Sequence, residues 1–191
     1  YGGTRAETLL GKALRGIPRT HYHLATKVGK HTNPARYGDD VFDYSRERIR
    51  RSLDESAARL GVDYFDIIHL HDMEYQSGRH VAQALTEGFE AVTELKYEGR
   101  TRAVGFGMYS MDLWHRVLET HPPDVALVHN HHALHDTRLL ELLPIARAKG
   151  VGIINGSPFG SGLLTPRGPA DWHPATAAQR TVFRAAADHC E

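Results

Sequence analysis

Short apolar runs alternate with amphipathic stretches along this chain, and this alternation constrains the fold more than any other feature. The runs are nearly continuous, which is typical of parallel strands that are buried on both faces. Between them, apolar residues recur at steps of three and four, as an amphipathic helix requires. The pattern predicts βαβ units and a parallel sheet. The predicted strands lie at residues 22–29, 64–71, 101–109, 125–130 and 150–158.

Capping residues mark the ends of the predicted helices. In the segment after the first strand, apolar residues recur from Ile49 to Leu60, Ser45 or Asp43 can cap the start, and Gly61 can end the helix. Further helices are predicted at both ends of the chain and in each gap between strands. Pro144 lies inside one of them and is predicted to kink or restart it, because proline lacks the backbone N–H.

Two architectures combine parallel strands with helices in this order, namely an eight-stranded barrel and an open doubly wound sheet. No strand is followed by a G-x-G-x-x-G turn, and the nearest match, GFGMYS at 105–110, lacks the third glycine. This favours the barrel. A complete (β/α)8 barrel needs about 250 residues, whereas this chain has 191. We therefore expect one domain, residues 1–191, that forms an incomplete (β/α)8 TIM-type barrel with about five visible strands and with strands missing at both ends.

Composition narrows the possible partners and the cell compartment. The chain has 23 basic and 23 acidic residues, so no strong field favours nucleic acid or a membrane surface. We expect a small-molecule substrate, and the composition does not indicate an oligomeric state. Cys190 is the single cysteine, and neither a membrane-spanning run nor a signal peptide is found, which predicts a cytoplasmic protein. The first residue is Tyr1 rather than Met, which suggests a fragment.

In a barrel of this type the chemistry lies where the strands end, at the C-terminal face. The residues at the predicted strand ends are Lys27, His71, Gly107, His129 and Ser157. Lysine at such a place is either a surface residue whose stem covers apolar neighbours or a buried ammonium that lowers the pKa of a nearby acid. Both interpretations of Lys27 stay open on these grounds.

His69 and His71 lie on the same face of one predicted strand, about 6.6 Å apart along it. His71 lies nearer the open end of the barrel, so a functional role is the better interpretation there. His69 lies deeper, and we expect a core histidine whose hydrogen bonds are satisfied. The H-x-H spacing also allows a metal site, because two imidazoles on one strand face could bind zinc together with ligands from the HNHH segment at 129–132.

Several motifs in order resemble the aldo-keto reductase family. Tyr1–Gly2 precedes a helix, and ATKVG at 25–29 and YFDIIHLHD at 64–72 follow. GFGMYS at 105–110 and IINGSPFGSGLL at 153–164 come where the next motifs of that family fall. The later segments look most similar to its sugar-dehydrogenase branch, which includes aldose 1-dehydrogenases. The resemblance implies an (α/β)8 barrel that binds NAD or NADP in extended form and transfers a hydride between the nicotinamide and a carbonyl or alcohol carbon.

By this resemblance the catalytic residues are Tyr1, Lys27 and His71, while the family's Asp falls before Tyr1. The chemistry explains these residue types. A phenol with a pKa near about 10 is a poor acid or base at neutral pH, but a neighbouring ammonium such as Lys27 lowers that pKa. His71 would donate a hydrogen bond to the substrate oxygen. Oxidation of a cyclic sugar at its anomeric carbon would give a lactone.

The expected cofactor contacts depart from the pattern of the family. Gly107 and His129 stand where the family commonly holds the nicotinamide amide, and Gly156 replaces the aromatic residue that stacks on the nicotinamide. We still expect Gly107, His129 and Ser157 to contact the cofactor, and we expect no metal.

Two other classes of function remain possible from the sequence. One is a metal-dependent hydrolase on the same barrel, and the other is a barrel that binds the cofactor without catalysis and acts in regulation. The polar segment at 29–40 is predicted to be a long loop that either caps the pocket or forms a surface insertion.

Overall fold

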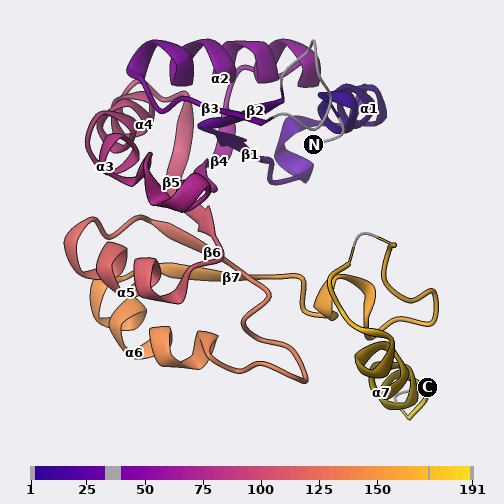
Figure 1. The fold of residues 1–191 in the computed structure, drawn as a ribbon. Helices are drawn as coiled ribbons and strands as arrows, with labels where there is room; N and C mark the ends of the chain where they lie inside the picture. Colours follow the sequence, from indigo (N-terminus) through magenta and orange to yellow (C-terminus); the bar gives the residue numbers. More distant parts are fainter. Residues whose placement is uncertain (1–2, 33–39, 172, 190–191) are drawn as a thin grey trace.

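A computed structural model describes residues 3–32, 40–171 and 173–189 of the chain. Parallel strands and helices alternate along it (Figure 1). The strands are β1 Ala25–Val28, β2 Lys30–Thr32, β3 Asp40–Phe42, β4 Phe65–His71, β5 Thr101–Met108, β6 Val125–His129 and β7 Gly152–Gly156. The helices are α1 Arg5–Ala13, α2 Arg46–Leu60, α3 Val81–Gln83, α4 Phe89–Tyr97, α5 Met111–Thr120, α6 Leu139–Lys149 and α7 Ala177–Asp188. Short 3-10 turns lie at Arg19–His21, Gln76–Gly78 and Gly160–Gly162, and a π-turn lies at Ala84–Gly88.

The main sheet contains five parallel strands in the order β1-β4-β5-β6-β7. Each strand lies beside the strand that precedes it in this sheet along the chain. A doubly wound sheet reverses this order at a switch point, so the observed order agrees with the predicted barrel. The five strands are those that the apolar runs predicted, with ends that differ by a few residues.

The segment predicted as a long loop contains a strand pair that the sequence did not reveal. β2 and β3 pair antiparallel, with Lys30 opposite Phe42, and they lie beyond the C-terminal end of β1. Gly29, with φ at 98°, turns the chain from β1 into β2, and a Cβ at this position would clash with the ring of Tyr44. Positive φ costs glycine little, so this residue permits the close approach. Residues 33–39 lie outside the described ranges.

The predicted caps of α2 are confirmed, since the Ser45 side chain accepts a hydrogen bond from Arg48 N–H and Gly61 ends the helix with φ at 70°. Of the two outcomes predicted at Pro144, a restart is excluded because α6 is one helix from Leu139 to Lys149, and a kink stays a prediction. Pro144 lacks the N–H that would bond the carbonyl of Leu140. Burial of Leu139, Leu142 and Ala146 keeps this helix in place despite that loss.

The core lies between the sheet and its helices. It contains Phe106, Trp114 and Ile68, whose exposed fractions are close to zero, together with side chains from α2, α4 and α6. Trp114 is a packing residue, and its ring N–H donates to the Met108 carbonyl at 3.2 Å. Trp172 lies outside the described residues. Figure 1 shows that α7 lies apart from the other helices, at the end of a long segment after β7.

Candidate active site

The alternation of side chains along the strands places the predicted site residues on one face of the sheet. Lys27 lies beside His69 on the neighbouring strand, and His69 lies beside Gly105. One step further along, His71 lies beside Gly107. The odd-numbered residues of these strands face away from the buried helix-facing core. In a barrel this face is the lumen, and we call it the lumen face.

Lys27 and His71 lie close enough for the charge of one to act on the other. Burial lowers the pKa of Lys27, and the carboxylate of Asp72 acts in the opposite direction. Burial also lowers the pKa of His71 to about 2, and the charges of Lys27 and Lys30 add to this effect. His71 is therefore a neutral imidazole at ordinary pH, which carries one N–H donor and one acceptor nitrogen. This is the form that can donate a hydrogen bond to a substrate oxygen without being an acid.

A hydrogen bond and a close side-chain contact hold the end of β4. The buried Tyr44 hydroxyl donates to the His71 carbonyl at 2.6 Å. Burial raises the pKa of this phenol well above its usual range, so it stays protonated and remains a donor. Gly107 leaves room for the imidazole, because a Cβ there would lie 3.3 Å from His71 Cδ2. The hydrogen bond thus holds the His71 backbone, and the missing side chain at Gly107 leaves room for the ring.

Asp72 and Lys30 complete the site, although the sequence reading did not single them out. Asp72 Oδ2 accepts a hydrogen bond from Lys30 Nζ at 2.7 Å, and Asp72 Oδ1 lies 3.1 Å from His71 Nε2. Lys30 also pairs with Asp40 at 3.2 Å. A signal for Asp72 was present, because it immediately follows a histidine at a strand end. No local signal identified Lys30, since the hairpin that carries it was predicted as a loop.

The three predicted cofactor residues also lie at this mouth. Gly107 is near the end of β5, His129 ends β6, and Ser157 follows β7. The Ser157 hydroxyl lies 3.3 Å from His129 Nδ1, so these two residues are within hydrogen-bond distance. A Cβ at Gly156 would lie 3.4 Å from His129 Nδ1. The mouth thus combines polar side chains with glycines, which leave space where larger residues would fill it.

His69 does not behave as the satisfied core residue that the sequence predicted. It is 2% exposed, and its Nδ1 has no hydrogen-bond partner among the described residues. Its ring fits only because Gly105 has no side chain, since a Cβ there would clash with Nδ1. Burial, aided by the charge of Lys27, lowers the pKa of His69 to about 4. The prediction of burial is confirmed, and the prediction of satisfied hydrogen bonds is wrong.

The predicted zinc alternative gains no support from the described part of the chain, where no group of three or more His, Cys, Asp or Glu side chains is arranged to hold a metal ion. The HNHH segment has another use. His131 is 1% exposed, its Nδ1 lies 3.0 Å from Asp136 Oδ2, and its Nε2 lies 2.6 Å from the Tyr109 carbonyl oxygen. This histidine therefore holds the loop after β6. Tyr1 lies outside the described residues.

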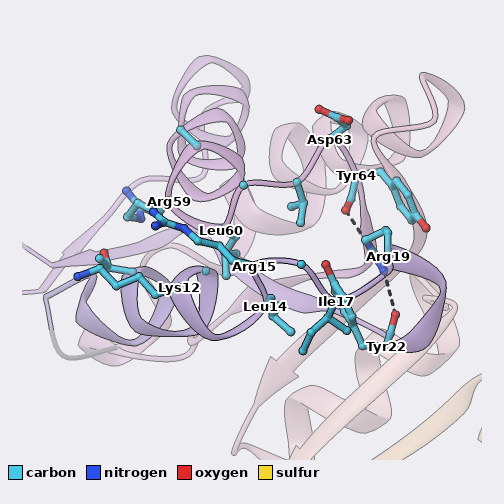
Figure 2. Close-up of a pocket in the computed structure, with 16 residues that line it drawn as sticks. Lys12, Leu14, Arg15, Ile17, Arg19, Tyr22, Arg59, Leu60, Asp63 and Tyr64 are labelled. Atoms are coloured by element: carbon cyan, nitrogen blue, oxygen red, sulfur yellow. Dashed lines mark hydrogen bonds between the residues drawn. The ribbon is translucent and has the colours of Figure 1, made fainter.

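A separate hollow of about 490 Å³ lies at the opposite ends of the strands, between α1, α2 and the segment before β1 (Figure 2). It contains several cations, of which Arg19 and Arg59 are already paired. The Arg19 guanidinium donates to the carbonyls of Tyr22 and Tyr64 and pairs with Asp66, and Arg59 pairs with Glu7. Cations are also favoured at the C-terminal ends of helices. The chemistry of the hollow is therefore explained by packing, and the predicted site residues lie elsewhere.

Comparison with known proteins identifies the family. The profile of the aldo/keto reductase family matches residues 1–189, and this chain belongs to that family. It is 42% identical over 196 residues to L-galactose dehydrogenase of Arabidopsis thaliana, a match that covers 100% of this chain and 58% of that protein. It is 31% identical over 188 residues to D-threo-aldose 1-dehydrogenase of a Pseudomonas species, covering 88% of this chain and 56% of that protein. The chain thus spans less than two thirds of the length of these relatives.

Solved structures agree with the fold. The holo form of an aldo-keto reductase from Bacillus halodurans matches with a TM-score of 0.70 and 26% identity, covering 90% of this chain and 54% of that chain. The sheet of five sequential parallel strands is thus an incomplete (β/α)8 barrel, as the sequence predicted. No helix within the described ranges has the length and apolar character needed to cross a membrane.

Proposed function

We propose that the full-length protein is an NAD(P)-dependent oxidoreductase that oxidises an aldose at its anomeric carbon to a lactone. One observation carries the proposal: Lys27 and a neutral His71 converge at the C-terminal end of adjacent parallel strands, in a chain of the aldo/keto reductase family. The relatives named above include two sugar dehydrogenases, which supports an aldose as the substrate. A single cysteine among 191 residues supports a cytoplasmic location.

The roles of the side chains follow from their charge states. Lys27 carries the positive charge of the site, and an ammonium favours the phenolate form of a neighbouring tyrosine. By its place in the motif, Tyr1 is that tyrosine, and as a phenolate it would take the proton of the sugar hydroxyl. His71 would donate its single N–H to the same oxygen and orient it, once the substrate replaces the contact of Nε2 with Asp72 Oδ1. The nicotinamide, when bound, supplies the acceptor for the hydride that leaves the carbon.

The residues at the mouth fit a flat aromatic group. Gly107 and Gly156 place no side chain at the ends of β5 and β7, so a ring can approach the backbone there. His129 and Ser157 supply polar atoms within reach of a carboxamide. These residues would hold the nicotinamide beside His71, while the choice between NAD and NADP stays open.

A substrate panel tests the proposal. The full-length protein is incubated with a set of aldoses and with NAD or NADP, and the absorbance of the reduced cofactor is followed. We expect turnover of at least one aldose with one cofactor, at a rate that a chelator leaves unchanged. Binding of cofactor without turnover of any aldose would support a non-catalytic barrel instead, and loss of activity on chelation would support the metal-dependent alternative.

A further inference from the structure

The carboxylate of Asp72 occupies a distinctive place in the candidate site. It lies between the ammonium of Lys30, at 2.7 Å, and Nε2 of His71, at 3.1 Å. Its side chain is 13% exposed, so it is largely shielded while it still reaches the mouth. Its charge also raises the pKa of Lys27 and of His129 against the dominant effect of burial. Asp72 therefore acts on residues from four strands at the mouth, namely β1, β2, β4 and β6.

The position of Asp72 is fixed by its backbone. Its φ is 59°, in the left-handed region that few residues other than glycine, asparagine and aspartate adopt. Its N–H donates to the Gly107 carbonyl at 3.0 Å, and its own carbonyl accepts from the Tyr75 N–H at 3.2 Å. A backbone conformation of this kind persists only where the surroundings hold it. The carboxylate is thus aimed at the mouth before any substrate arrives.

The contacts of Lys30 also hold its side chain in place. Burial lowers the pKa of Lys30, but the hydrogen bonds and charges of Asp72 and Asp40 together outweigh burial and raise that pKa. Asp40 pairs with the same ammonium at 3.2 Å, and the ammonium lies 4.6 Å from the centre of the Tyr75 ring. Lys30 therefore keeps its positive charge beside the Asp72 carboxylate. An ionised carboxylate is an acceptor only.

The carboxylate has acceptor capacity left after these contacts. Two carboxylate oxygens offer about four lone-pair positions, and the described contacts of the side chain are with Lys30 and His71. A hydrogen-bond donor of the substrate can use the remainder, and a hydroxyl on a carbon next to the reacting one is such a donor. The Tyr75 ring beside it is 50% exposed and offers a flat surface to the C–H groups of a sugar. An aldehyde without that hydroxyl has no hydrogen-bond donor for the carboxylate.

We propose that Asp72 determines specificity by accepting a hydrogen bond from a substrate hydroxyl adjacent to the reacting carbon. The site would then favour hydroxyaldehydes and aldoses over aldehydes without that hydroxyl. This inference rests on the proposed oxidoreductase function and adds a recognition element to it. A site built to bind a substrate hydroxyl discriminates strongly against the analogue that lacks it, because its own polar group then remains unpaired.

The test compares two substrates in two variants of the full-length protein. Glyceraldehyde carries the adjacent hydroxyl, and propanal lacks it; both are reduced with NADH or NADPH, and kcat/KM is measured for each. Asp72→Asn keeps the size of the side chain and removes its charge. Asp72→Gly removes every acceptor atom and suits the positive φ. A hydrogen bond to a charged group contributes about 1.5–3 kcal/mol. We therefore expect the ratio of kcat/KM for glyceraldehyde to kcat/KM for propanal to fall by about 10- to 100-fold, beyond any loss that both substrates share because Asp72 contacts His71.

Asp40→Asn is the matched control, because it removes the same charge from the other side of the same lysine. We expect this variant to keep the preference for glyceraldehyde. Equal losses on both aldehydes in the Asp72 variants would show that the carboxylate acts only by orienting His71. No loss on either aldehyde would show that the carboxylate does not contact the substrate hydroxyl. Either result overturns the proposal. Propanal turnover tests the oxidoreductase function separately. The wild type should reduce propanal, and the Lys27→Met variant should not. If the wild type reduces neither aldehyde, the proposed role of Asp72 is wrong, while the aldose panel still decides the oxidoreductase function.

Discussion

The two faces of the five-stranded sheet differ sharply, although the same strands supply both. On the face toward the helices, residues such as Val28, Leu70 and Phe106 are apolar and have exposed fractions near zero. On the lumen face, the positions beside them are held by Lys27, His71 and Gly107. One step along a strand therefore separates a packing residue from a candidate catalytic residue.

The difference shows how this fold divides its tasks. Apolar side chains that interlock with the helices supply stability, and that face tolerates few polar groups. The lumen face instead carries buried polar groups that cost stability, namely Lys27 and the neutral histidines, and glycines that leave space beside them. A residue can therefore be assigned to stability or to chemistry by the face on which it lies, and four predictions test this division.

The largest effect is expected from Lys27→Met in the full-length protein. The variant keeps the length of the side chain and removes the charge that we propose activates Tyr1, so kcat should fall by about 10²- to 10⁴-fold. The free energy of unfolding should not fall, because burial already opposes the ammonium. Steady-state kinetics and urea unfolding measure the two quantities. Thr26→Val, on the opposite face of the same strand, is the control and should keep its activity. An active Lys27→Met variant would contradict the catalytic role assigned to Lys27.

Phe106→Ala should show the reverse pattern. Phe106 is 0% exposed and stacks with Phe89, with ring centres 5.4 Å apart. Loss of a buried phenylalanine costs about 3–5 kcal/mol of stability, and the activity of the remaining folded protein should be close to that of the wild type. Tyr97→Ala provides the comparison, since that side chain is 87% exposed and its loss should change stability by less than about 0.5 kcal/mol. Similar losses in both variants would argue against the described core.

The contacts of Asp66 predict that the free energy of unfolding depends on pH while activity does not. Burial raises the pKa of Asp66, but hydrogen bonds from the Leu24 N–H and from Arg19 outweigh burial and lower it to about 2. Because the folded-state pKa is depressed, the stabilisation is present above pH 4 and is lost as the pH falls toward 2. Asp66→Asn should therefore cost about 2 kcal/mol at neutral pH and flatten the loss of stability below pH 4. Urea unfolding across this pH range measures the free energy of unfolding. The pH profile of kcat should stay unchanged.

The smallest effect is expected from Gly107→Ala. The added Cβ would lie 3.3 Å from His71 Cδ2 and 3.4 Å from Leu127 Cδ2, so neighbours must move by a few tenths of an ångström. We expect a loss of stability below about 1 kcal/mol and a fall in kcat/KM of less than about tenfold. Gly105→Ala gives the contrast, because its Cβ would meet His69 and the Val125 backbone at much shorter distances. If Gly107→Ala destabilised the protein more than Gly105→Ala, the lumen geometry described above would be wrong.

Much of this fold was readable from local pattern. Continuous apolar runs identified the strands of the main sheet, and residues such as Ser45 and Gly61 marked helix ends correctly. These signals act over a few residues, because capping and side-chain periodicity depend only on near neighbours. The same periodicity placed His69 and His71 on one face. The position at strand ends indicated Lys27 and His71 as candidates, and the resemblance to the family assigned their roles.

The sequence by itself thus determined the order of strands and helices and the face on which each strand residue lies. The tertiary structure decided the rest: that Lys30 of the unpredicted hairpin meets Asp72, 42 positions away, and that Gly105 leaves room for His69 and its unpartnered Nδ1. The physical reason is that an ion pair or a cavity depends on atoms brought together by packing. The sequence spacing of Lys30 and Asp72 carries no periodic signal that would pair them.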